Sequence, residues 1–336
     1  MIRHPTIKDV AHAAQVSTAT VSRVLEQAAS VRPKTRARVL KAVADVNYSP
    51  NIMARNLRRQ ETRSIFLVVR DMHNPFYLEV FRGVEAEARA RGYNVLMGNT
   101  EDCVERGREY LQMLKARHAD GMILMTGKLS PDLHDMLRRE CPPVVVASEY
   151  FPGLDLPTVR IDNVAAAEAA VRHLVALGHR RIAHITGPTP EVLSLDRHRG
   201  YLQALDEAGM AAEPLLTVRG NFTIESGHRA CRALYHLNPM PTAIFCSNDE
   251  MAMGAINELR RLGLAVPQHV SVVGFDDIVF AGAFHPPLTT IRQPRQDMGK
   301  AAMRLLSDLL AERPVSSEPI MMPTELIVRG STAPPA

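Results

Sequence analysis

Apolar residues recur at helical spacing near the start of the chain and predict a helix over residues 7–14. A second helix is expected over Thr18–Glu26, because Ser17 is placed to cap it and its apolar residues face the first helix. Two short helices joined by three residues are typical of a helix-turn-helix. A third helix over residues 33–46, with Pro33 at its first position, would close a small apolar core.

From residue 64 onward, short apolar strands alternate with amphipathic helices. The expected strands are 65–69, 94–97, 122–125, 144–147, 182–186, 216–218, 243–246 and 271–274, with helices at 76–91, 104–117 and 133–139. Repeated strand-helix-strand units require right-handed crossovers and build parallel sheets. The pattern therefore predicts an α/β fold, and the lengths fit two parallel sheets better than one.

Composition excludes several classes of protein. The 336 residues are 46% apolar and 23% charged, which is ordinary for two or three folded units and unlike a collagen or a disordered chain. No apolar run approaches the ~20 residues needed to cross a bilayer. No export signal is visible either, so we expect a cytoplasmic protein with no membrane partner. The cysteines form no CxxC pair, so neither a metal site nor a disulfide framework is expected, and no cofactor is indicated.

Charge is distributed very unevenly along the chain. Residues 1–63 hold nine Arg and three Lys against two Asp and two Glu, a balance of +8, whereas the remainder carries −4. Such asymmetry favours a small module that faces a polyanion such as double-stranded DNA, joined to a larger body with another task. The alternative is a three-helix mini-domain whose basic residues only solvate its surface.

In a helix-turn-helix, the N-terminal part of the second helix enters the major groove. The side chains at these positions are Thr18, Ala19, Thr20, Ser22 and Arg23. Arg23 could donate two hydrogen bonds to a guanine, and Ala19 could contact a thymine methyl group. Thr20 and Ser22 suit phosphate as well as base contacts.

The basic segment 49–60 begins like a capped helix, but only about eight of its residues could be helical, and helices this short are marginal in water. It is expected to form only when something holds it. Met53 and Leu57 would then share one side, which suits insertion into the minor groove as an apolar wedge. An ordinary flexible linker is the alternative.

Four segments of the chain resemble the head and hinge helix of the lactose/galactose repressor (LacI/GalR) family. They are residues 6–11 (TIKDVA), 16–25 (VSTATVSRVL), 47–51 (NYSPN) and 54–57 (ARNL). The resemblance continues across nearly the whole chain and implies a homodimer whose two heads bind a near-palindromic operator. It adds Thr6, Ser17, Asn51, Ala54, Arg55 and Leu57 to the DNA-binding positions, with Leu57 as the minor-groove lever.

The resemblance also implies a two-lobed core, similar to a periplasmic binding protein, with three crossovers between the lobes. The expected organisation is a head at 1–48, a hinge and linker at 49–63, and an effector-binding and dimerisation core at 64–336. Lobe 1 would comprise about 64–162 and 291–322, and lobe 2 about 163–290 and 323–332.

Polar residues gather just after the predicted strands, where open parallel sheets bind ligands. They are Asp71, Asn74, Ser148, Asp162, 247–249 and 276–277. The cleft between two facing sheets is therefore the expected ligand site.

The resemblance assigns effector-binding positions within this cleft. They are Phe76, Tyr77, Ser148, Arg197, Phe222, Asn248, Asp276 and Gln293. A carboxylate and a guanidinium can grip vicinal hydroxyls of a ribose or sugar, and aromatic faces can sandwich a flat base. Outside this motif context, a lone Phe or Asp would be read as core packing or as a helix cap.

Ser148 and Leu193 stand where purine-responsive members of the family carry an acidic and a hydroxyl residue. A nucleoside such as cytidine is therefore the expected effector, with a sugar as the alternative. The protein is expected to be a repressor released from DNA by this effector, although a corepressed regulator fits the same residues.

A solute-binding protein and an enzyme are the two alternative function classes. A solute-binding protein shares the two-lobed core but does not explain the basic head. An enzyme is not indicated, because no GxGxxG, P-loop, GxSxG or HExxH motif occurs.

Overall fold

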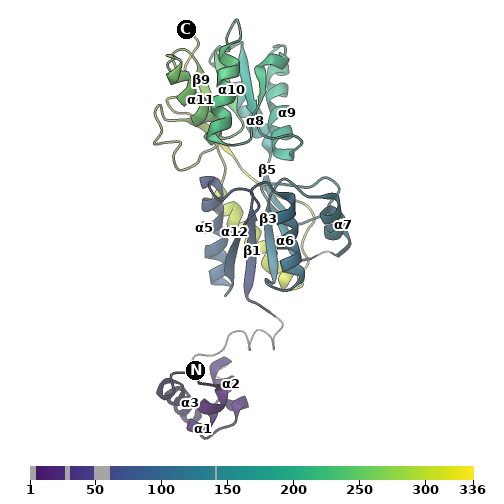
Figure 1. Ribbon diagram of the computed structural model, residues 1–336, viewed down its shortest axis with the longest axis vertical. Coiled ribbons are helices and arrows are strands. Elements are labelled where there is room, and N and C mark those ends of the chain that lie inside the picture. The colour runs from purple at the N-terminus through teal and green to yellow at the C-terminus, as the bar shows by residue number, and fades with distance from the viewer. Residues whose placement is uncertain (1–4, 27–30, 49–60, 141) are drawn as a thin grey trace. The chain divides into compact units, whose positions relative to one another are not determined.

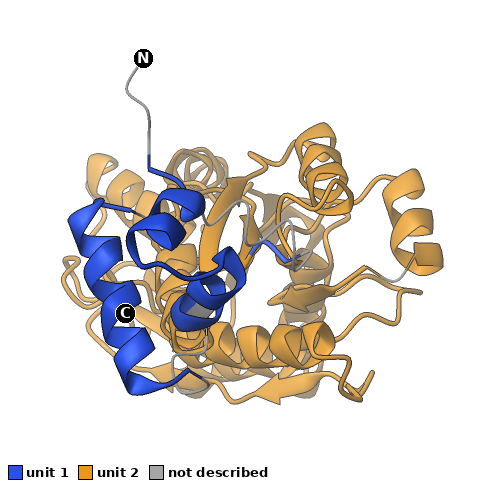
Figure 2. Ribbon diagram, turned by 90° about the horizontal axis from the view of Figure 1, so that it is seen from below, with its two compact units in different colours: residues 1–62 blue, residues 63–336 orange. Residues whose placement is uncertain are grey.

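The computed structural model describes residues 5–26, 31–48, 61–140 and 142–336. The chain divides into two compact units, residues 1–62 and 63–336, which Figure 2 distinguishes by colour. Each unit has an apolar core of its own.

The described residues of the first unit form three helices around a small apolar core. They are α1 (Ile7–Ala13), α2 (Thr18–Glu26) and α3 (Pro33–Asp45). Val10, Val21 and Val39 are fully buried where these helices meet. The Thr6 amide donates to Asp9 Oδ2 at 2.8 Å, and the Thr20 amide donates to Ser17 Oγ at 3.2 Å. These short-range bonds fix the starts of α1 and α2 at the predicted positions.

The first lobe of the second unit is built on a six-stranded sheet with the order β11-β5-β4-β3-β1-β2. Its strands are β1 (Ser64–Val69), β2 (Asn94–Asn99), β3 (Gly121–Met125), β4 (Val144–Ala147), β5 (Thr158–Ile161) and β11 (Ile320–Met322). Figure 1 labels β1, β3 and β5 of this sheet. All neighbouring strands in it are parallel. Its helices are α5 (Pro75–Ala90), α6 (Val104–Lys115), α7 (Pro131–Glu140) and α12 (Arg295–Leu310).

Alternate residues of β1 are buried on opposite faces of this sheet. Ile65 and Leu67 pack in one apolar cluster with residues of α5 and α12, whereas Phe66 and Val68 pack in another with residues of α6 and α7. A strand covered on both faces reads as a continuous apolar run, as SIFLVV does.

The second lobe repeats this plan with the strand order β12-β10-β9-β8-β6-β7. Its strands are β6 (Ile182–Thr186), β7 (Thr217–Arg219), β8 (Ala243–Cys246), β9 (Ser271–Asp276), β10 (Thr289–Arg292) and β12 (Glu325–Ile327). β12 is antiparallel to β10, and the other pairs are parallel. Its helices are α8 (Asn163–Ala176), α9 (Val192–Glu207), α10 (Ile224–Tyr235) and α11 (Asp249–Arg261), with a 3-10 turn, η2 (Pro214–Leu216), before β7.

The chain crosses between the two sheets after Ile161, after Arg292 and after Met322. The return to the first lobe therefore comes slightly later than the sequence suggested. Ile291, expected in lobe 1, pairs with Phe275 and Leu326 and so belongs to the second sheet. The apolar pattern does not show which sheet a strand joins, because either sheet would bury it.

Candidate functional site

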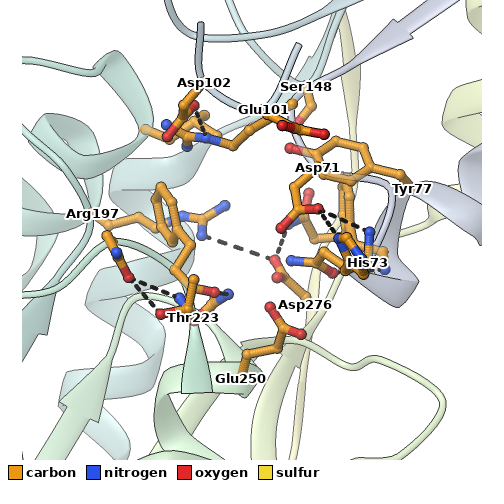
Figure 3. Close-up of a pocket in the computed structure, with 18 residues that line it drawn as sticks. Asp71, His73, Tyr77, Glu101, Asp102, Ser148, Arg197, Thr223, Glu250 and Asp276 are labelled. Atoms are coloured by element: carbon orange, nitrogen blue, oxygen red, sulfur yellow. Dashed lines mark hydrogen bonds and ion pairs between the residues drawn. The ribbon is translucent and has the colours of Figure 1, made fainter. Parts of the chain in front are cut away.

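A cavity of about 260 Å³ lies between the two lobes, at the carboxyl ends of their strands (Figure 3). All eight effector-binding positions expected from the sequence line it: Phe76, Tyr77, Ser148, Arg197, Phe222, Asn248, Asp276 and Gln293. It is also lined by Arg70, Asp71, His73, Asn74, Glu101, Asp102, Leu193, Asn221, Thr223 and Glu250. A volume of this order suits a small ligand.

Arg197 and Asp276 face each other across this cavity, with Arg197 Nη1 3.9 Å from Asp276 Oδ1 (Figure 3). Arg197 is held from behind, because its Nε donates to Asn163 Oδ1 at 2.9 Å and its Nη1 donates to the Ser247 carbonyl at 2.5 Å. Asp276 Oδ1 accepts from Gln293 Nε2 at 2.7 Å. Burial raises the pKa of Asp276 to about 6, although Arg197 and Gln293 oppose the shift. The pair thus offers an acceptor and a donor side by side.

Aromatic side chains enter the cavity from both lobes. Phe76 and Tyr77 lie edge to face at the start of α5, with ring centroids 5.4 Å apart. The start of this helix is fixed by Asn74, whose Oδ1 accepts from the Phe76 amide at 2.8 Å. Phe222 comes from the other lobe, and the Arg70 guanidinium lies 5.0 Å from its ring centroid. Aromatic side chains of both lobes thus line the cavity, which suits a ring-shaped ligand.

Three of the predicted effector-binding residues have backbone conformations that are uncommon outside glycine. The φ angles are 69° at Ser148, 68° at Phe222 and 114° at Asp276. Strained residues of this kind persist only where the surrounding structure holds them, and they cluster at binding sites. The strain supports a role in binding for this cavity.

Some residues of the predicted polar cluster do not line the cavity. Asp162 caps α8 by accepting from the Ala165 amide at 3.0 Å. Asp249 is buried and accepts from the Thr290 hydroxyl at 2.5 Å. Ser247 bonds to His184, and Asp277 is held by Arg292 and Arg329. These residues lie at the expected edge of the sheets, where the strands end. Their side chains are engaged in hydrogen bonds and ion pairs within the protein, so we assign them a structural role.

Sequence reasoning passed over Arg70, Asp102 and Glu250. Arg70 follows β1 directly and donates through Nε to Asp102 Oδ1 at 2.5 Å. Burial and the nearby carboxylates of Asp276 and Asp71 raise the pKa of Glu250 to about 7. The position just after a strand marks all three, because Arg70 follows β1 directly and Asp102 and Glu250 follow the ends of β2 and β8 within four residues.

Most of the predicted DNA-binding residues of the head lie on α2 or directly before it. Ser17, Thr18, Ala19 and Arg23 are exposed and Thr20 and Ser22 are half-buried, as is expected if the adjacent Val21 and Val24 fill the core. Thr6 is exposed at the start of α1. Asn51, Ala54, Arg55 and Leu57 lie outside the described residues, so their roles stay predictions.

Known proteins of one family contain both the helix-turn-helix head and the two-lobed domain that holds the cavity. Residues 6–51 match the bacterial regulatory proteins of the lacI family, and residues 171–332 match a periplasmic binding protein-like domain. The HTH-type transcriptional repressor CytR of Escherichia coli K12 is 43% identical over 327 residues, which is 97% of this chain and 96% of that protein. The chain belongs to the lacI family. The resemblance seen in the sequence is thereby confirmed, and the protein is a DNA-binding transcriptional regulator.

Other members of the lacI family match over the same length. The HTH-type transcriptional repressor PurR of Aliivibrio fischeri is 36% identical over 98% of both chains. The lac repressor dimer bound to operator and the anti-inducer ONPF superposes with a TM-score of 0.89 at 28% identity, covering 98% of this chain and all of that one. A transcriptional regulator CelR–cellobiose complex gives a TM-score of 0.74 at 33% identity over 98% of this chain. These relatives are regulators and not enzymes.

Two further observations concern the described part of the chain. None of its helices is long and apolar enough to cross a membrane. No group of three or more His, Cys, Asp or Glu side chains within it is arranged to hold a metal ion.

Proposed function

We propose that this lacI-family repressor binds a two-fold symmetric operator as a homodimer in the cytoplasm and is released from it by an uncharged nucleoside, with cytidine as the first candidate. The observation that carries the proposal is the Arg197–Asp276 pair facing aromatic rings of both lobes within one cavity. The pair suits the vicinal hydroxyls of a ribose, and the rings suit a flat base.

The charges around the cavity favour an uncharged ligand over a phosphate ester. Carboxyl groups outnumber basic side chains in the lining: Asp71, Glu101, Asp102, Glu250 and Asp276 against Arg70, Arg197 and His73. The raised pKa values of Glu250 and Asp276, about 7 and about 6, leave Glu250 partly protonated near neutral pH, and the balance of the lining stays negative. Both arginines already lie beside carboxylates, Arg70 at Asp102 and Arg197 at Asp276. A phosphate group would meet net repulsion here, so a nucleoside should bind much better than its monophosphate.

Similarity to a dimeric relative supports the homodimer. The lac repressor that superposes on this chain over 98% of its length is a dimer bound to operator.

Release from DNA requires that the effector bind two lobe arrangements unequally, because a ligand with equal affinity for both shifts nothing. Operator and effector must then weaken each other's binding by the same factor. A ligand that strengthens operator binding would make the protein a corepressed regulator.

A sugar is the second candidate effector. A carboxylate and a guanidinium can grip sugar hydroxyls as well as ribose hydroxyls. The similar CelR was solved with cellobiose, and a lacI-family regulator of Enterococcus faecium with bound ribose.

The test uses the full chain and an operator selected from random duplexes. We expect cytidine to raise the melting temperature and to weaken operator binding measured by fluorescence anisotropy, since it binds the folded protein. Cytidine monophosphate should do neither at equal concentration. Asp276→Asn should lose the cytidine effect and still bind operator.

Asp297→Asn is the matched control, because Asp297 is exposed on α12 and pairs only locally with Lys300. It should respond to cytidine as the unaltered protein does. A melting shift with cellobiose or ribose but not with cytidine would select the sugar alternative. No selected operator at low salt would overturn the proposal.

A further inference from the structure

Arg70 connects the two lobes beside the cavity. It emerges from the carboxyl end of β1 in the first lobe and donates through Nη2 to Glu191 Oε1, at the start of α9 in the second lobe. Its Nε donates to Asp102 of its own lobe at 2.5 Å. Its guanidinium also lies over the ring of Phe222 from the second lobe. One side chain thus makes two contacts across the cleft.

Glu191 is enclosed by the first lobe. Its side chain is 2% exposed and that of Arg70 is 7% exposed. Lys128 Nζ, which follows β3, lies 3.7 Å from Glu191 Oε1 and 3.5 Å from Asp102 Oδ2. A Cβ at Gly127 would come within 3.2 Å of Glu191 Oε2, so the missing side chain leaves space for this carboxylate. The glutamate of one lobe therefore fits a site made by the other.

We infer that Arg70 is a positioning residue, which holds the two lobes together around the cavity through Glu191 and thereby sets how tightly the effector binds. Its Nε and Nη2 are engaged by Asp102 and Glu191, so we assign its effect on the ligand to the contact between the lobes and to the placement of Phe222. The effect on effector affinity rests on the proposed function, whereas the contact between the lobes through Arg70 and Glu191 does not.

The energetics of buried ion pairs predict how single and double substitutions of Arg70 and Glu191 should differ. Removing one partner leaves an uncompensated buried charge, which strongly disfavours the arrangement that buries it. Replacing both partners by apolar side chains of similar size is often neutral. In Arg70→Met the buried Glu191 loses its hydrogen-bonded guanidinium and keeps only Lys128 Nζ, 3.7 Å away, whereas in Glu191→Met the Arg70 side chain keeps Asp102 as a partner. Each single change removes the contact between the lobes, and Arg70→Met should loosen them more than Glu191→Met. The double change should restore part of the contact. Asp102 keeps Lys128 as a partner in all of these variants.

The experiment compares full-length Arg70→Met, Glu191→Met and the Arg70→Met/Glu191→Met double variant by backbone hydrogen exchange without ligand. We expect exchange at residues 70–74, 187–191 and 221–223 to rise by roughly tenfold in Arg70→Met, to rise by less in Glu191→Met, and to return toward the original rate in the double variant. Glu213→Met is the matched control, because Glu213 pairs with Arg181 within the second lobe and is half-exposed. It should leave these segments unchanged.

A second arm measures cytidine affinity by calorimetry in the same proteins. Arg70→Met should bind roughly tenfold more weakly and Glu191→Met should lose less, and the double variant should recover part of the loss, because it still lacks the contact of Arg70 with Phe222. Unchanged exchange in Glu191→Met, or a double variant worse than either single one, would overturn the inference. If cytidine binds none of the proteins, the proposed effector fails, and the exchange pattern alone decides the role of Arg70.

Discussion

Asn248 lies two residues after the end of β8, and both polar atoms of its side-chain amide are hydrogen-bonded. Its Oδ1 accepts from the Met251 amide at 3.0 Å, and its Nδ2 donates to the Phe222 carbonyl at 2.9 Å. The side chain therefore caps α11 and fixes the loop that carries Phe222 into the cavity. The sequence correctly brought Asn248 to the cavity, but these two bonds favour a role in placing the aromatic ring.

Arg23 is the residue of the head with the most specific predicted contact. It is exposed on α2, and its fork of donors matches guanine in the major groove. Arg23→Ala should relax base preference at one position of the operator half-site, at a cost of about 1–3 kcal/mol, measured by binding to single-base variants of the selected operator.

The control for Arg23 is Lys41→Ala, because Lys41 is an exposed basic residue of α3. Lys41→Ala should leave the base preference at that position intact. If Arg23→Ala weakens binding equally on every duplex, Arg23 contacts phosphate only.

Helices with caps or prolines at their starts were predicted to within a residue or two. α2 begins at Thr18 after Ser17, α3 begins at Pro33, and α5 begins at Pro75 after Asn74. These signals act within one turn, so the local sequence is sufficient. Strand ends were harder to predict. β9 was expected to end at Gly274 but continues to Asp276, because Phe275 and Asp276 pair with β10.

The hinge segment carries a prediction of its own, although residues 49–60 lie outside the described part of the chain. Leu57→Ala should reduce operator affinity and DNA bending, because an apolar wedge that unstacks a base step would be lost. Bending would be measured by energy transfer between the ends of a labelled operator. The effector affinity should not change.

Leu40→Ala supplies the comparison for Leu57, because Leu40 is a leucine 45% exposed on α3. It should leave bending intact. Equal bending by the Leu57→Ala variant and the unaltered protein would remove the wedge role.

The stability of the whole protein should depend on a buried carboxyl group behind the cavity. Glu149 is 2% exposed, and its Oε2 has no hydrogen-bond partner among the described residues. Burial raises the pKa of this carboxyl from 4.5 to about 7, against the opposing effect of Arg70. Between these two values the folded state holds a proton that the unfolded state lacks, so stability falls as pH rises through this range.

Glu149→Gln should remove this contribution. The variant should melt higher than the unaltered protein at pH 8, and the advantage should shrink at pH 5, where the native carboxyl is protonated. Melting curves at both pH values measure it. Glu140→Gln, at an exposed glutamate that pairs with Lys115, should show no such difference. An identical pH profile for Glu149→Gln and the unaltered protein would show that Glu149 ionises normally.

The sequence by itself determined the helix-turn-helix, the alternation of strands and helices, and the concentration of positive charge in the first 63 residues. Periodicity, caps and net charge are properties of short stretches of chain, so they can be read without coordinates. The resemblance to the family also indicated eight residues as effector-binding positions, and all eight line the cavity. Only the tertiary structure decided that Arg70 meets Glu191, 121 positions away, and that Asp249 and Asp277 are structural. Such contacts depend on the order of strands in two sheets and on how two lobes close, which no local pattern encodes.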